Sequence, residues 1–379
     1  MSIRKIPKFI KFILPVALIV GLVIASTPPR EVQATEETFI ASQSWEAPVN
    51  VFSVTAECWG GGAGGSADGN LAARPGGGGG GGAYAKTATV PVTPGQTYTI
   101  TVGAAVSAET NGNLSSFVGN DGTKCEAAGG TTTTNRSGGA GGTVAASTGD
   151  LGSVFAGGAG GTAANSNDNG GAGGGEGAAT TATGNNGSAN SGGTGGAGGT
   201  GTDGGDGGPG GDNTADGTVG TAPGGGGGGA GGTNDVGGGG AKGQVKVTYT
   251  AKVAPTITSV SDAPDPIEAG NVITFTTDWN DGDGDQIKVK VCKTNSLSNQ
   301  NCTGGSWASS TAFTLTDPKD ETYTTQTTDE GAKDYWVFVC DTDALCSAGS
   351  AGSFTVTIPS GEPIRIKGGV KVKGGVKVR

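Results

Sequence analysis

The sequence predicts a mainly β fold in two parts: a glycine-rich part ordered through its backbone, and a separate β-sandwich. Three observations support this prediction. Glycine accounts for 80 of the 379 residues, and 66 of those 80 lie between residues 60 and 243. Runs with alternating apolar residues bracket this stretch on both sides. Residues 254–359 contain little glycine, and their short strand-like runs show no convincing helical pattern.

Both ends of the chain are basic, whereas the body is acidic. Residues 1–34 carry a net charge of +4 and residues 360–379 a net charge of +5, which leaves −19 on the body out of a total of −10. The first segment has a basic head, an apolar run from Phe12 to Ala25 and a small-residue site ending at Ala34. This order is typical of a signal peptide, and an uncleaved N-terminal anchor is the alternative. Either one exports the rest of the chain.

The basic tail repeats Lys-Gly-Gly-Val-Lys-Val within residues 360–379. It is interpreted either as a small β-element or as an unfolded basic arm that anionic polymers or lipid head groups would attract. The acidic body repels phosphate backbones, so we expect no nucleic-acid binding. The chain contains no histidine, which excludes the usual His-based nucleophile pairs and general bases. We therefore expect no enzyme activity and no catalytic residues.

Strand patterns surround the glycine-rich stretch. Phe52, Val54, Ala56 and Cys58 alternate with polar residues and predict a strand that ends in Trp59-Gly60-Gly61-Gly62. Two further alternating runs, at 83–92 and 97–102, are separated by Thr-Pro-Gly-Gln and predict a hairpin. The run 244–249 predicts the strand that closes this region.

Glycine recurs with a period of three from Gly192 to Asp212, which reads GGT GGA GGT GTD GGD GGP GGD. A left-handed helix with three residues per turn places the third residues along one edge and leaves two bare backbone edges. Such edges let neighbouring helices approach and make backbone contacts. We expect the third residues to face water. If the repeat is one helix, its 21 residues extend roughly 65 Å at about 3.1 Å per residue. A flexible glycine linker is the alternative.

Residues 254–359 predict seven short strands and hence a β-sandwich of the immunoglobulin or fibronectin type III kind. The expected strands cover residues 256–260, 272–279, 286–293, 312–316, 323–327, 334–340 and 353–358. The candidate core consists of Trp279, Val289, Trp336, Phe338, Phe354 and Val356.

Six cysteines in an exported chain favour disulfides. Fifteen pairings are possible for six cysteines, and we expect neighbours in sequence to pair. The expected pairs are Cys58 with Cys125, Cys292 with Cys302, and Cys340 with Cys346.

The densest group of oxygen ligands lies in one loop and consists of Asp278, Asp281, Asp283 and Asp285. Alternating carboxylates on a tight loop can supply several of the six to eight oxygens that calcium takes. An EF-hand is rejected, because counting from Asp281 places Cys292 where a bidentate glutamate is required. An ordinary β-turn between strands is the alternative to a Ca²⁺ site.

One ordered series of motifs resembles a known family. The motifs are Trp45-Glu46-Ala47-Pro48, Ser53 to Gly62, Gly76 to Tyr84, Pro94 to Tyr98, Ser115 to Phe117 and Gly243 to Tyr249. Together they resemble the glycine-rich domain of bacterial surface proteins and phage tail-tip adhesins, over about residues 38–250. The resemblance implies a β-rich base that bears a bundle of polyglycine-II helices. Because the leader, two cysteines and an appended sandwich are unlike a phage tail tip, receptor binding is not carried over.

These patterns together predict a non-enzymatic structural or adhesive protein that is secreted or held at the surface of a bacterial envelope. The expected partner is a surface receptor, a glycan or an envelope polymer, and a membrane is contacted only through an uncleaved N-terminal segment. The alternative is a calcium-stabilised extracellular binding module in which the glycine region is a flexible spacer.

Overall fold

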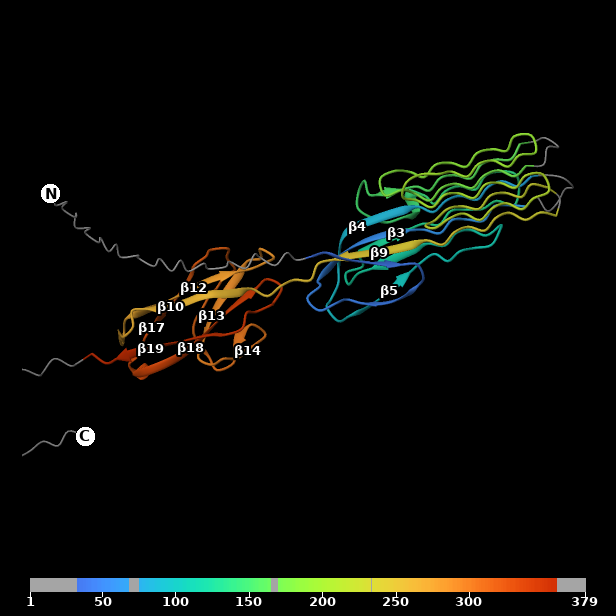
Figure 1. Cartoon of the computed structure of the whole chain (residues 1–379). Helices are drawn as coiled ribbons and strands as arrows, with labels where there is room; N and C mark the ends of the chain where they lie inside the picture. Colours follow the sequence, from blue (N-terminus) through green and yellow to red (C-terminus); the bar gives the residue numbers. More distant parts are fainter. Residues whose placement is uncertain (1–32, 68–74, 165–169, 233, 360–379) are drawn as a thin grey trace, which may run out of the picture. The chain divides into compact units, whose positions relative to one another are not determined.

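The computed structural model describes residues 33–67, 75–164, 170–232 and 234–359, and they form a mainly β structure (Figure 1). The predicted leader, except residues 33 and 34, and the basic tail lie outside these ranges. Helical structure in the described residues consists of two 3-10 turns, η1 (Val144–Ala146) and η2 (Thr327–Asp329). None of their helices has the length and apolar character needed to cross a bilayer.

The first region contains two antiparallel sheets. One sheet has the order β1 (Thr35–Phe39), β9 (Gln244–Tyr249), β3 (Ser53–Trp59), β4 (Tyr84–Pro91) and β8 (Val154–Phe155). The other has the order β2 (Gln43–Glu46), β5 (Thr97–Thr101), β6 (Ser115–Val118) and β7 (Lys124–Ala127). Strand β9 is the run predicted at 244–249, and it pairs with both β1 and β3.

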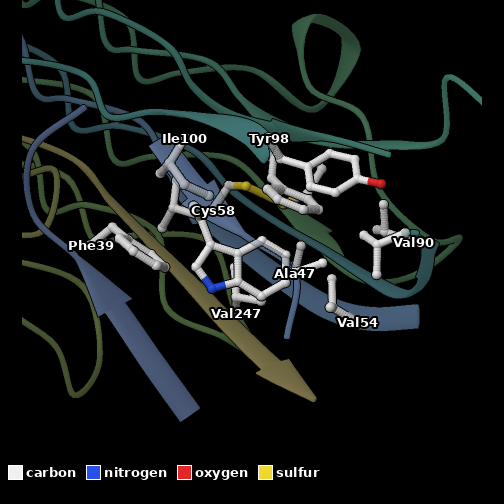
Figure 2. Packing of buried hydrophobic residues seen from close by; sticks show 14 of the residues in the cluster. Phe39, Ala47, Val54, Cys58, Val90, Tyr98, Ile100 and Val247 are labelled. Carbon is white, nitrogen blue, oxygen red and sulfur yellow. A yellow bond between two sulfur atoms is a disulfide. The ribbon is translucent and has the colours of Figure 1, made fainter. Parts of the chain in front are cut away.

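A single apolar core joins these two sheets (Figure 2). Val54, Ala56 and Cys58 of β3 are buried in it as predicted, whereas Phe52 precedes the strand, is only half-buried and lies outside the core. Trp45 of β2 is 5% exposed and lies edge-on to Phe117 of β6, with ring centroids 5.8 Å apart. Aromatic pairs in this arrangement add to the stabilisation that burial provides.

The hairpin predicted at 83–102 is wrong, because its two strands do not pair with each other. A turn does lie between the two strands, and the amide of Gln96 donates to the carbonyl of Thr93 over 3.0 Å. However, β4 pairs with β3 and β8, whereas β5 pairs with β2 and β6. The chain therefore crosses from one sheet to the other at this turn. An alternating sequence pattern is compatible with either choice of partner strand, so it does not distinguish a hairpin from a crossover.

The glycine-rich stretches form extended segments that lie side by side (Figure 1). Segment 77–82 illustrates how they are joined. Its six amides donate, over 2.8–3.1 Å, in order to the carbonyls of Asn135, Gly161, Gly227, Thr131, Gly158 and Gly224. Amides three positions apart therefore donate to the same neighbouring segment, and successive amides point to three different neighbours.

Close approach of the backbones explains why glycine is needed in these segments. A Cβ added to Gly80 would lie 2.0 Å from the carbonyl oxygen of Ala140, and one added to Gly226 would lie 2.3 Å from that of Gly79. Segments 76–82 and 224–229 consist of glycine alone and are buried throughout. Each has neighbours on all sides, so no position in them leaves room for a side chain.

The repeat from Gly192 to Asp212 is not one straight helix, because it folds back on itself. Its first two residues have a positive φ, and the chain bends at residues 202–204. The amide of Gly207 donates to the carbonyl of Gly199 and that of Gly210 to the carbonyl of Gly196. Two shorter antiparallel halves thus replace the expected length. The third residues are exposed as expected, apart from the half-buried Asp206.

The second region contains two larger sheets and a two-stranded ribbon. The first sheet has the order β10 (Thr256–Ala263), β12 (Val272–Asn280) and β17 (Lys319–Thr324). The second has the order β11 (Ile267–Glu268), β19 (Ser350–Thr357), β18 (Gly331–Asp341), β13 (Ile287–Cys292) and β16 (Ser306–Ser309). The ribbon pairs β14 (Leu297–Ser298) with β15 (Asn301–Cys302).

Both larger sheets contribute to one apolar core, which includes Phe275 of β12, Val289 of β13 and Phe354 of β19. The core face of β18 differs from the prediction. Tyr335, Val337 and Val339 belong to the core cluster, whereas Trp336 is only half-buried. The strand is apolar at both odd and even positions, so alternation alone does not identify its inner face. Phe338 is buried, although it lies outside that cluster.

The strand predicted at 312–316 is also wrong. In this segment Thr314 makes only an isolated bridge to Ile287, and the strands that pair with β13 are β18 and the earlier β16.

Candidate metal centre

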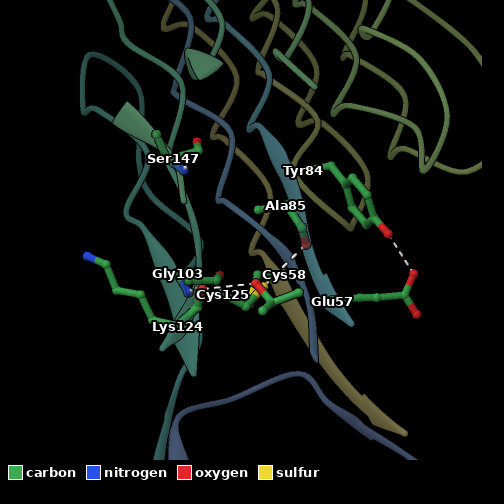
Figure 3. Close-up of a disulfide and its surroundings, with 11 residues drawn as sticks. Glu57, Cys58, Tyr84, Ala85, Gly103, Lys124, Cys125 and Ser147 are labelled. Atoms are coloured by element: carbon green, nitrogen blue, oxygen red, sulfur yellow. Dashed lines mark hydrogen bonds between the residues drawn. A yellow bond between two sulfur atoms is a disulfide. The ribbon is translucent and has the colours of Figure 1, made fainter. Parts of the chain in front are cut away.

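The six cysteines pair in sequence order, as predicted. The first pair joins Cys58 of β3 to Cys125 of β7 and thereby links the two sheets of the first region (Figure 3). Both residues are completely buried. Beside this disulfide, the Tyr84 hydroxyl donates to Glu57 over 2.6 Å, and burial is the main cause that raises the tyrosine pKa far above its usual range.

The loop after β12 brings together three of the four predicted metal ligands. Asp281, Asp283 and Asp285 each place one carboxylate oxygen within 4.8 Å of the others, and all three are half-buried. The amides of Asp283 and Asp285 donate to Oδ1 of Asp281 over 2.8 and 3.2 Å. Gly284 has a φ of +75°, a conformation that glycine adopts without strain. The carboxylate of Asp281 thus fixes the backbone conformation of the loop.

Asp278, the fourth predicted ligand, lies elsewhere. It is part of β12, and its Oδ2 accepts a hydrogen bond from the hydroxyl of Ser259 on β10. The structure therefore separates Asp278 from the three aspartates of the loop.

Two acidic residues that the sequence analysis missed lie at the end of β18. Asp341 pairs with Ile287 of β13, close to the loop that ends at Asp285. It is fully buried, its Oδ1 accepts the amide of Leu345 over 2.8 Å, and its Oδ2 has no hydrogen-bond partner. Burial first, and then the negative charges of Asp281 and Asp343, raise the pKa of Asp341 to about 6.

Lys252 connects this group to the segment between the two regions. Its Nζ lies 2.9 Å from Oδ2 of Asp285 and 3.5 Å from Oδ2 of Asp343. Burial lowers the pKa of Lys252, but the hydrogen bond and charge of Asp285 outweigh that effect and raise it above the usual value. The next residue, Val253, donates its amide to Oδ2 of Asp283 over 2.6 Å.

We call these carboxylates the acidic cluster, and its members are Asp281, Asp283, Asp285, Asp341 and Asp343. No sequence spacing links the last two to the loop, since some sixty residues separate them. The pairing of β13 with β18 brings them there. All donor atoms are oxygens, the ligand type that suits calcium, magnesium or manganese.

Comparison with known proteins identifies the first region. A family model described as a glycine-rich domain matches residues 35–250, which is more than half of the chain. The matched range begins three residues before the boundary predicted from the sequence and ends at the same residue. A comparison with curated proteins found no match.

Proposed function

Because this chain belongs to the glycine-rich domain family, we propose that it is an exported, non-enzymatic cell-surface protein with a structural or adhesive role. In this proposal residues 38–250 form a β-rich base that displays a bundle of polyglycine-II helices. The partner is a surface receptor, a glycan or an envelope polymer, and the site of action is the bacterial envelope or its surroundings. The proposal rests on one observation: the amides of the glycine segments donate hydrogen bonds with a period of three residues.

Three segments support the polyglycine-II assignment independently. In 77–82, 171–178 and 225–230, amides three positions apart donate to the same neighbouring segment. A helix with three residues per turn produces this pattern, because each step turns the next amide toward another neighbour. A flexible spacer would leave most of these amides to water. The bonding therefore favours display over the spacer role of the alternative function.

The periphery of the bundle is suited to recognition. The third residues of the Gly-Gly-X repeat are exposed, among them Thr194, Ala197 and Thr200. The side chains of Asp203 and Asp212 accept hydrogen bonds within the bundle, whereas those of Thr194, Ala197 and Thr200 can vary with the partner while the backbone stays the same. Exposed residues on a rigid support are where binding functions commonly reside.

The remaining parts complete the proposed role. The second region serves as a spacer, and its two sheets around one core are consistent with an immunoglobulin- or fibronectin-type β-sandwich. Three disulfides suit an oxidising compartment outside the cytoplasm. Residues 1–34 would direct export, and residues 360–379 would provide a basic contact to an anionic wall polymer.

Export and surface display are tested by expressing the full chain in a bacterial host and labelling intact cells with a membrane-impermeant amine reagent. We expect labelling of the full chain, either on the cells or in the medium, and none of a matched chain that lacks residues 1–34. Equal labelling of both chains, or of neither, contradicts the proposal.

Adhesion is tested by retention of the full chain on purified envelope polymers and on whole cells. The variant Gly80→Ala disturbs the bundle, whereas Gly282→Ala changes a glycine of the second region whose added Cβ would meet no atom within 4 Å. We expect loss of retention with the first variant only. Retention that survives Gly80→Ala would assign binding to the second region, as the alternative function requires.

A further inference from the structure

The acidic cluster concentrates negative charge with little compensation. Five carboxylates face a single ammonium group, since Lys252 is the only cation that makes an ion pair with the cluster among the residues the structure describes. Half-buried and buried carboxylates repel one another, and burial adds the cost of removing them from water. The excess negative charge of the acidic cluster therefore favours the binding of a further cation.

Two oxygens of the cluster lack any partner. Oδ2 of Asp281 and Oδ2 of Asp341 are inaccessible to solvent and accept no hydrogen bond. Asp341 is completely buried, and the negative charge of Asp281 helps to raise its pKa. Nearly all buried polar atoms in folded proteins are satisfied, so an unpartnered carboxylate oxygen indicates an ion or a water. A cation bound to both oxygens would satisfy them together.

We propose that the acidic cluster binds one Ca²⁺ ion, and that Lys252 supplies the counter-charge when no ion is bound. The ligands come from two separate elements: the loop after β12 and the end of β18. Oδ1 of Asp281 and Oδ1 of Asp341 hold the backbone of these elements in place, which leaves their Oδ2 atoms free to bind the ion.

Calcium fits this donor set better than other common cations. It accepts six to eight oxygens in irregular geometry, and several carboxylates can contribute directly. Magnesium requires a near-ideal octahedron and usually retains several waters, so it binds through only one or two carboxylates. Zinc and copper favour nitrogen or sulfur ligands, and cysteines at this end of β18 are already paired with each other.

Lys252 and the ion compete for the same oxygens. The lysine Nζ occupies Oδ2 of Asp285 and Oδ2 of Asp343, so calcium must displace it or share these ligands with it. The backbone that follows Lys252 is held independently of the lysine side chain, because the Val253 amide donates to Asp283. Replacing Lys252 by a residue without an amine should therefore strengthen calcium binding. The same replacement should destabilise the protein when no calcium is bound.

The test titrates the full chain with CaCl₂ and with MgCl₂ and follows the thermal midpoint, together with Tb³⁺ luminescence sensitised by tryptophan. Trp279 lies two residues before Asp281 and can act as the sensitiser. We expect a saturable rise of several degrees with Ca²⁺, because a ligand that binds only the folded state raises its midpoint. Magnesium should give a much smaller rise, and Ca²⁺ should quench the Tb³⁺ signal.

Variants separate ion binding from a general effect of salt. Asp281→Asn keeps an oxygen that can accept the two loop amides, and it should weaken Ca²⁺ binding at least tenfold. Asp278→Asn, on the strand that precedes the loop, is the matched control and should leave the affinity unchanged. Lys252→Met should tighten Ca²⁺ binding and lower the midpoint without calcium.

Several results would overturn the proposal. The absence of a midpoint rise at 10 mM Ca²⁺ would do so, as would equal rises for Asp281→Asn and the unchanged chain. A weaker Ca²⁺ affinity in Lys252→Met would show that the lysine does not compete with the ion. If Asp281→Asn does not fold, Asp341→Asn provides the same comparison, since it too removes one carboxylate charge from the cluster.

Discussion

Replacing Gly80 by alanine tests whether backbone contact holds the glycine segments together. The added Cβ would lie 2.0 Å from the oxygen and 2.4 Å from the carbon of the Ala140 carbonyl. A carbon and a carbonyl oxygen approach to about 3.3 Å at the closest, so the two segments must separate by about 1.3 Å. All the atoms in contact belong to the backbone, and no flexible side chain can yield instead.

Such a separation removes hydrogen bonds on both sides of Gly80. The amides of Gly139 and Gly142 donate to Gly78 and Gly81 over 2.8 Å each, and these bonds would lengthen beyond the usual limit. The loss of two bonds at about 1 kcal/mol each, with about 1–3 kcal/mol for overpacking, predicts a destabilisation of about 3–5 kcal/mol. The gain from a less flexible unfolded chain is smaller, at about 0.4–1 kcal/mol.

The measurement is urea unfolding of the full chain followed by tryptophan fluorescence, combined with hydrogen exchange. Trp59 is 4% exposed, immediately precedes Gly60 and reports on the first region. We expect faster exchange of the amides of 77–82 in the variant and no change within 254–359. The control Gly282→Ala should have no effect or be slightly stabilising. If both variants unfold at the same urea concentration, the bundle does not depend on backbone contact.

Three further changes test the cores and the acidic cluster. Replacing Cys58 and Cys125 together by alanine should cost about 4 kcal/mol in urea unfolding, because their bond closes a loop with a sequence separation of 67; an unchanged midpoint contradicts this. Phe117→Ala should cost about 3–5 kcal/mol by the same measurement, since the ring is fully buried. Without calcium, ionisation of Asp341 should reduce stability by up to about 3 kcal/mol as pH rises from 4 to 6, because its pKa in the folded state is about 6 against an ordinary 3.8. In pH-dependent unfolding, Asp341→Asn should lack this loss, and identical pH profiles would refute the assignment.

The sequence predicts the parts of the fold that depend on local pattern. The strand at 244–249, the inner face of β3, the pairing of the cysteines and the exposure of the third repeat residues all follow from spacing. The fold-back at residues 202–204 was missed, although Gly201-Thr202-Asp203, which lies there, is the one triplet of the repeat without a second glycine. Backbone direction is only weakly encoded where side chains are absent.

The candidate metal centre was predicted in part for a related reason. Asp281, Asp283 and Asp285 share one loop, so their proximity is visible in the sequence. Asp278 is close to these residues in the sequence, but it lies on β12 and accepts a hydrogen bond from Ser259. Asp341 reaches the site only through the pairing of β18 with β13, and one sequence does not specify the register between distant strands.

The rotation of successive amides restricts how the glycine segments can change in length. Within 77–82, deleting or adding one residue would turn every later amide by a third of a turn, away from its acceptor and toward another neighbour. A change of three residues would restore the alignment. Segments of this kind should therefore grow and shrink in triplets along their buried lengths, whereas the bends between them can accept insertions of any size.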